Sequence, residues 1–272
     1  MKNGVLYNLN LSIKKHIYRI IKKILSNSNF VMMKNSTYFE LTRAAHRSKF
    51  VELLNAVPKS HRNRLLELYP KTFSQNYQDL FALSSNHFKR NGFFVEFGAT
   101  NGVNISNTYL LEKEFKWSGI LVEPAISWHQ ELKMNLTCTI DTNCVWSASE
   151  EDISFCETNE KEYSTIKNFF SADLHHEKRS NYSEYIVKSI SLLDLLKKYD
   201  APRIIDYISI DTEGSEYEIL KNFDFKEYQF RSITCEHNFT ENRNAIFNLL
   251  TSFGYRRVNY DIKSYEDWYI RH

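Results

Sequence analysis

The sequence lacks three patterns, each of which would have pointed to a different class of protein. Its four cysteines form no C-x-x-C pair, which disfavours a disulfide framework or a zinc site and favours reduced thiols in a cytosolic protein. No stretch reaches the roughly 18 consecutive apolar residues of a membrane span. No dinucleotide fingerprint G-x-G-x-x-G is complete, because Thr100 stands where its second glycine would be.

The chain does contain enough apolar sequence for one large domain. Its 272 residues are 42% hydrophobic and 25% charged, which is ordinary for a globular protein. The net charge of +2 conceals an asymmetry, because residues 1–72 carry 14 Lys and Arg against three Asp and Glu. We therefore divide the chain into a basic, helical N-terminal extension over residues 1–72 and a domain over residues 73–272.

The basic extension contains one amphipathic segment, residues 11–25. Isoleucines recur at helical spacing on one face, and Lys and Arg occupy the other. Such a helix suits peripheral attachment to an anionic membrane surface or to an acidic partner. It equally suits packing on the domain with a solvated basic face, and both interpretations stay open.

The most informative stretch is residues 93–104. Its first five residues are apolar, aromatic or β-branched apart from Glu96, which predicts a buried strand. A turn with Gly98 and Gly102 follows, and then a predicted helix over residues 105–115. Strand, turn and helix in this order present backbone N–H groups to a ligand. Thr100 would hinder the close approach of a pyrophosphate, so the turn favours a ligand without phosphates, or else it is an ordinary βα turn.

A second predicted strand ends at Glu123, where Pro124 stops it. Glu123 lies about twenty residues beyond the glycine turn, where a carboxylate accepts both hydroxyls of a ribose. A third short strand over residues 143–147 would bring Trp146 and Ser147 to an adenine, although Trp146 equally fits a core position. Residues 157–182 are polar and lack a clear period, so we expect a mobile loop or insertion over the site.

Acidic groups and a histidine follow two later predicted strands. Asp211 and Glu213 come at the end of one strand, and Glu236 and His237 at the end of the next. So many acids near one turn are costly unless they bind a cation, a donor group or water. Two interpretations stay open: Mg²⁺ held by Asp211 and Glu236, or a hydrogen-bonded acid–base cluster without metal.

Three segments together resemble the FkbM family of S-adenosylmethionine-dependent methyltransferases: residues 94–102, 119–124 and 208–216. Ser74-Gln75 and Gln78-Asp79 are similar to the leading motif of that family, so the resemblance covers roughly residues 73–270. It implies an α/β, class I (Rossmann-like) methyltransferase fold with a seven-stranded, mostly parallel sheet and an antiparallel last strand. It also implies S-adenosylmethionine as cofactor and methylation of oxygen on sugars, glycans or related small molecules. Glu96 replaces the usual Asp and keeps its charge.

The resemblance also implies roles for individual residues. The methionine part of the cofactor would contact the glycine turn, its amino group would be held through water by the first acid, and the ribose and adenine would contact the second and third strand ends. The implied cofactor-binding residues are Glu96, Gly98, Ala99, Gly102, Asn107, Glu123, Trp146, Ser147 and Asp211. We take His237 as the general base, with Asp211 or Glu236 orienting it or holding a metal.

The competing hypothesis is a non-catalytic protein that keeps the methyltransferase fold as an interaction module. A nicotinamide-dependent oxidoreductase is disfavoured by Thr100. For the enzyme we expect a small-molecule or glycan acceptor, no nucleic-acid partner, and a cytoplasmic location that is membrane-peripheral if residues 11–25 attach to a membrane surface.

Overall fold

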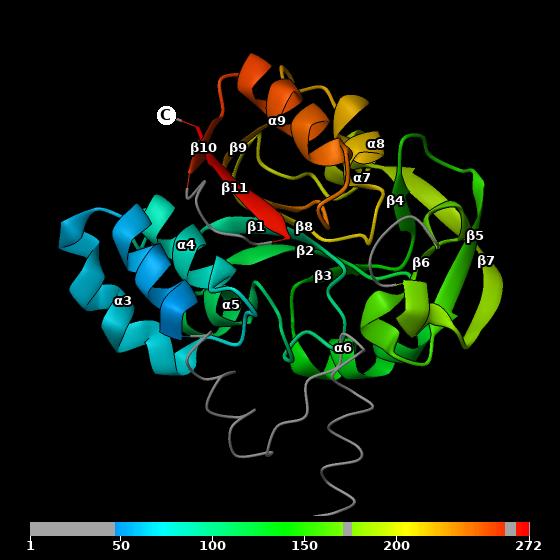
Figure 1. Ribbon diagram of the computed structural model, residues 1–272, viewed down its shortest axis with the longest axis horizontal. Coiled ribbons are helices and arrows are strands. Elements are labelled where there is room, and N and C mark those ends of the chain that lie inside the picture. Colours follow the sequence, from blue (N-terminus) through cyan, green and yellow to red (C-terminus); the bar gives the residue numbers. More distant parts are fainter. Residues whose placement is uncertain (1–46, 171–175, 259–264, 272) are drawn as a thin grey trace, which may run out of the picture. The chain divides into compact units, whose positions relative to one another are not determined.

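The computed structural model describes residues 47–170, 176–258 and 265–271 (Figure 1). The predicted amphipathic helix over residues 11–25 lies outside this part of the chain. None of the helices in the described ranges is both long and apolar enough to cross a membrane.

A seven-stranded sheet forms the centre of the described structure, in the order β10-β11-β9-β8-β1-β2-β3. All neighbouring pairs are parallel except those of β11, which runs antiparallel to both β9 and β10. The strands are β1 (Phe93–Phe97), β2 (Ser118–Val122), β3 (Thr139–Asp141), β8 (Ile204–Ile210), β9 (Gln229–Glu236), β10 (Arg256–Val258) and β11 (Glu266–Ile270). The predicted mostly parallel sheet with an antiparallel last strand is confirmed.

Helices cover both faces of this sheet (Figure 1). Alternate strand residues point to opposite faces, so each strand contributes to two apolar clusters. Phe94 and Leu121 pack with α4 (Gln78–Ser85), α5 (Tyr109–Phe115) and α6 (His129–Asn135). Val95 and Ile208 pack with α7 (Leu192–Lys198), α8 (Glu216–Lys221) and α9 (Asn242–Ser252). The central strands are therefore apolar on both sides, which explains their nearly continuous hydrophobic sequence.

Part of the predicted extension belongs to the first of these clusters. Residues 47–56 are helical, and α3 (Arg62–Leu68) follows after a short 3₁₀ turn. Phe50, Leu53, Leu65 and Leu68 are buried with Leu80 of α4. The proposed boundary at residue 72 stays a prediction.

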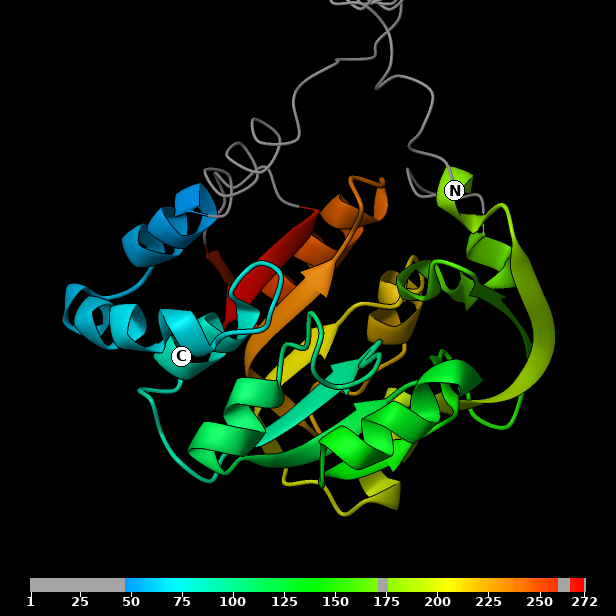
Figure 2. The same ribbon diagram turned by 90° about the horizontal axis from the view of Figure 1, so that it is seen from below.

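A second, four-stranded sheet has the order β4-β7-β5-β6. Both views show it on the side of the molecule away from α3 (Figures 1 and 2). Its strands are β4 (Cys144–Trp146), β5 (Asp152–Thr158), β6 (Thr165–Ile166) and β7 (Tyr182–Ser191). The expected third strand over residues 143–147 therefore belongs to this sheet, and Thr139–Asp141 takes the third position in the main sheet. Residues 157–182, expected to form a mobile loop or insertion over the site, include the end of β5, β6, three 3₁₀ turns and the first residue of β7 among their described residues. The sequence did not indicate β7, because much of the strand is exposed, including Ile186.

The helices α4, α5 and α7 differ in how they begin. Ser74 does not cap a helix: its hydroxyl donates to Asp79 Oδ1 at 2.6 Å, and α4 begins after Tyr77, whose φ is +67°. The helix expected from residue 105 begins at Tyr109. Ser191 caps α7, because its hydroxyl accepts the Asp194 N–H at 3.1 Å.

Candidate active site

A cavity opens at the carboxyl ends of β1, β2 and β8, with about 660 Å³ of empty space including its mouth. Gly98 follows β1, Glu123 follows β2 and Asp211 follows β8, and all three line it. Ligands of parallel α/β sheets bind where the strands end in this way.

Gly98 allows the ends of β1 and β8 to approach closely. Its φ is +72°, and a Cβ atom there would lie 2.3 Å from the carbonyl oxygen of Asp211. Any other residue would force the two strand ends apart or strain the backbone. The glycine therefore fixes one wall of the cavity.

Glu123 is 4% exposed, and backbone groups hold both of its carboxylate oxygens. Oε1 accepts the Ala125 N–H and Oε2 accepts the Thr100 N–H, both at 2.8 Å. Burial raises the pKa of Glu123 to about 7 despite these hydrogen bonds. Each carboxylate oxygen carries two lone pairs, so Glu123 can also accept hydrogen bonds from a ligand in the cavity.

Glu96, in β1, is not among the residues that line the cavity. Its Oε1 accepts the Asn107 N–H at 2.8 Å, and its Oε2 accepts the hydroxyl of Thr108. Burial, with the negative charge of Asp211 as a smaller contribution, raises the pKa of Glu96 to about 7. Glu96 therefore fixes the residues that precede α5 and is close enough to Asp211 for their charges to interact.

Three carboxylates meet beside the cavity. Asp211, Glu213 and Glu236 each place an oxygen within 4.8 Å of the others. Burial, followed by the charge of Asp211, raises the pKa of Glu236 well above its ordinary value, and the two side chains are hydrogen-bonded. Burial raises the pKa of Asp211 to about 6. A hydrogen bond between two carboxyl groups requires a proton between them, and Glu213 is already paired with Arg179. This donor set fits a shared proton better than a divalent metal.

His237 lines a neighbouring cavity of about 550 Å³ together with Gly214, Glu216 and Asn238. Its Nδ1 accepts the Phe239 N–H at 3.1 Å, and its Nε2 lies 3.7 Å from Asp267 Oδ1. The imidazole thus lies outside the lining of the main cavity. Its role as general base stays a prediction.

The structure brings Gly98, Glu123 and Asp211 together and places the other predicted cofactor contacts outside the cavity lining. Gly102 lies against α6, since an added Cβ would be 2.7 Å from Leu132. Trp146 packs in the second sheet, with its ring 6.0 Å from that of Phe169. The predicted residues outside the lining are Glu96, Ala99, Gly102, Asn107, Trp146, Ser147, Glu236 and His237, and their functional roles stay predictions.

Sequence reasoning missed the residues that close the cavity on the side of the second sheet. Lys161, Glu162, Ser164 and Ile166 line it from residues 157–182. We expected this stretch to lie over the site, but its lack of periodicity gave no signal for which residues face inward. Val145 of β4 also lines the cavity, whereas its neighbour Trp146, which was predicted to contact the cofactor, does not.

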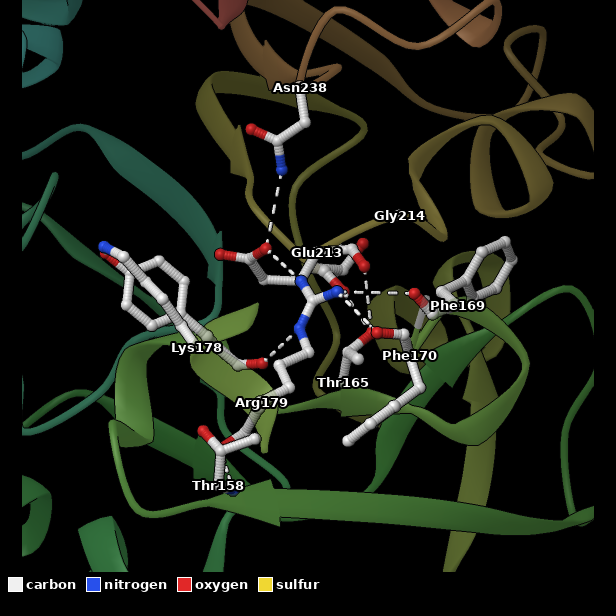
Figure 3. A network of polar contacts seen from close by, with 12 residues as sticks. Thr158, Thr165, Phe169, Phe170, Lys178, Arg179, Glu213, Gly214 and Asn238 are labelled. Atoms are coloured by element: carbon white, nitrogen blue, oxygen red, sulfur yellow. Dashed lines mark hydrogen bonds and ion pairs between the residues drawn. The ribbon is translucent and has the colours of Figure 1, made fainter. Parts of the chain in front are cut away.

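A buried arginine attaches this stretch to the edge of the main sheet (Figure 3). Arg179 is fully buried, and its Nη2 lies 2.7 Å from Glu213 Oε2. Its Nε donates to the Tyr163 carbonyl at 2.9 Å, and its Nη1 donates to that of Phe170 at 3.1 Å. The Thr165 hydroxyl donates to the Glu213 carbonyl at 2.9 Å. These bonds hold residues 163–170 against the turn that follows β8.

Comparisons with known proteins give a family and two similar structures. The family model of the methyltransferase FkbM domain matches residues 96–257. The chain is similar, at 10% identity and a TM-score of 0.39, to a precorrin-6y C5,15-methyltransferase from Geobacter metallireducens, over 74% of this chain and 92% of that one. It is similar, at 8% identity and a TM-score of 0.38, to a ribosomal protein L11 methylase from Lactobacillus delbrueckii subsp. bulgaricus, over 72% and 77%. A search of the curated proteins gave no match.

Proposed function

Because this chain belongs to the FkbM methyltransferase family, we propose that it methylates a hydroxyl oxygen of a sugar, a glycan or a related small molecule. The family and the fold imply S-adenosylmethionine as the methyl donor. The main support for placing the donor in the described cavity is that Glu123 and Asp211 line it beside Gly98. Our proposal goes beyond the family in two respects: the class of acceptor, and an oxygen as the atom that is methylated.

The residues of the cavity fit this donor. Glu123 would accept the ribose hydroxyls, because the N–H groups of Thr100 and Ala125 hold its carboxylate in a fixed orientation. The acidic lining favours a cationic ligand, and the donor carries a positively charged sulfonium group. When bound, that group supplies an electrophilic methyl, so positioning the acceptor accounts for much of the rate.

The acceptor hydroxyl must lose its proton, and we assign Asp211 to receive it. Asp211 lines the cavity, and burial raises its pKa to about 6, which suits a general base near neutral pH. Burial raises the pKa of Glu236, and its hydrogen bond to Asp211 would orient the carboxylate.

A second version of the proposal keeps the sequence-based hypothesis, with His237 as base and Mg²⁺ on Asp211 and Glu236. Its support is the close approach of the three carboxylate oxygens, which lie within 4.8 Å. Mg²⁺ would have to replace the proton that Asp211 and Glu236 share. Chelation separates the versions, because dialysis against EDTA leaves activity unchanged in the first and abolishes it in the second.

The function is tested with methyl-labelled S-adenosylmethionine and a panel of monosaccharides, nucleotide sugars and oligosaccharides. We expect label in at least one hydroxyl acceptor, and we expect Asp211→Asn to abolish transfer while calorimetry still detects S-adenosylhomocysteine binding. His237→Ala should retain transfer in the first version and lose it in the second. Absence of any heat with S-adenosylhomocysteine would favour the non-catalytic interaction module.

We also propose a cytoplasmic location for the enzyme, with no nucleic-acid partner. Attachment of residues 11–25 to an anionic membrane surface remains the alternative, supported by their basic and apolar faces. Cell fractionation of the full chain, with and without the Lys and Arg of this segment, tests the attachment.

A further inference from the structure

Ile105 is an exposed apolar residue of the cavity at the carboxyl ends of β1, β2 and β8. It lies between the glycine turn and α5, lines the cavity and is 42% exposed. Five other apolar side chains of the lining are buried: Phe97, Val122, Val145, Phe155 and Ile166. Ile105 therefore lies at the mouth of the cavity, where a bound ligand would cover it.

The backbone of Ile105 is strained. Its φ is +54°, in the left-handed region that non-glycine residues rarely take. For a β-branched residue this conformation is an outlier, because its side chain crowds the backbone there. Strain of this kind costs free energy of folding, and in proteins it is concentrated at ligand and active sites. Ile105 thus combines two features that folding alone does not favour, an exposed apolar side chain and a strained backbone.

Hydrogen bonds on both sides hold Ile105 in this conformation. Before it, Asn101 Oδ1 accepts the Asn104 N–H at 2.9 Å. After it, the Asn107 N–H donates to Glu96 Oε1 at 2.8 Å. Because both flanking residues are fixed, the left-handed conformation is imposed on Ile105. Its side chain therefore has a defined place at the cavity mouth before any ligand binds.

We propose that Ile105 contacts bound S-adenosylmethionine and covers the side of the donor that faces the mouth of the cavity. In the unliganded protein its exposed surface contributes no burial to folding. A ligand that covers this surface removes it from water, which favours binding. The strained residue therefore contributes to affinity for the donor. The inference rests on the proposed function, because it takes this cavity as the donor site.

The test is titration calorimetry of the full chain with S-adenosylhomocysteine, together with urea unfolding of the unliganded protein. Ile105→Asn should weaken binding by about tenfold, the effect of no longer burying roughly half of an isoleucine side chain. It should not lower the urea midpoint, because asparagine takes the left-handed region more readily than isoleucine. Ile105→Val stays apolar and β-branched and should keep the affinity within about threefold.

Lys116→Asn is the matched control. Lys116 has a similar φ of +59°, is exposed and is not among the residues that line the cavity. Its replacement should leave the affinity unchanged and should not lower the midpoint. Ile105→Gly is the second variant, for the case that Ile105→Asn does not fold, because glycine takes this φ without strain.

The proposal is overturned if Ile105→Asn, or Ile105→Gly in its place, binds S-adenosylhomocysteine as tightly as Lys116→Asn does; the proposed function then still stands. It is also overturned if Ile105→Val loses as much affinity as Ile105→Asn, because the contact would then not depend on an apolar side chain. Weaker binding together with a lower urea midpoint would assign Ile105 to the fold and not to the donor. Absence of heat with the wild type would instead overturn the proposed function, and the donor contact with it.

Discussion

Replacing Arg179 by Met should destabilise the protein more than any surface charge change. Arg179 is fully buried, and its partner Glu213 is 7% exposed. Met fills much of the same volume but leaves the Glu213 carboxylate without its ion pair. It also removes the donors to the carbonyls of Tyr163 and Phe170.

Loss of one partner from a buried ion pair costs about 3–5 kcal/mol, because the remaining charge stays desolvated. The stability of a typical domain is about 5–15 kcal/mol, so the variant should lose a large part of it. Adding Glu213→Gln to Arg179→Met removes the stranded charge and should recover about 1–3 kcal/mol of that loss. The effect on the site should be weaker binding of S-adenosylhomocysteine, because Arg179 holds residues that close the cavity.

Urea unfolding of the wild type, Arg179→Met, Glu213→Gln and the double variant gives a double-mutant cycle. Arg64→Met is the matched control, because Arg64 pairs with Glu67 at 2.6 Å but both side chains are more than half exposed. Its loss should be below about 1 kcal/mol. If Arg179→Met costs no more than this control, the buried pair does not hold the second sheet as we argue.

Three further results follow from the cavity. Gly98→Ala should lower the melting temperature and abolish S-adenosylhomocysteine binding in calorimetry, whereas Gly254→Ala, with a similar positive φ but nothing within 4 Å, should affect only stability. Glu123→Gln should weaken that binding by about tenfold while the fold stays intact; unchanged affinity would remove Glu123 from the ribose site. The free energy of unfolding of the unliganded protein should rise as the pH falls from 8 to 5. In that range folded Glu96 and Glu123, with pKa values raised to about 7 from 4.5, bind protons that the unfolded chain does not. If urea unfolding gives a lower free energy of unfolding at pH 5 than at pH 8, the raised pKa values of Glu96 and Glu123 are contradicted.

The cavity edge could be predicted because its signals are local. A β-rich apolar run, a glycine turn and an acid at the next strand end each depend on a few adjacent residues. Gly98, Glu123 and Asp211, which these signals indicate, line one cavity, and their roles in cofactor binding stay predictions. The second sheet could not be predicted in the same way. Its strand β7 pairs with β4 and β5, which lie some 25–45 residues earlier in the chain, and much of it is exposed. Neither pairing nor burial was visible in the local pattern.

The placement of His237 shows a second limit. Glu236 and His237 are adjacent, and both were assigned to one acid–base cluster. Successive side chains at a strand end point to opposite sides of the sheet. Two adjacent residues therefore do not face the same cavity. Glu236 bonds to Asp211, whereas His237 lies beside Asp267 and lines another cavity.

The direction of β11 places an acid at one end of the sheet and a base at the other. In the parallel strands the acids follow the strand ends, so they gather at one edge. Because β11 is reversed, its first residue Glu266 lies opposite Glu236 and adds to the acidic edge. Arg271, one residue beyond its end, reaches the other edge beside Arg231. If β11 ran parallel to β9, Glu266 would lie at the end where β9 begins and Arg271 at the end where β9 finishes.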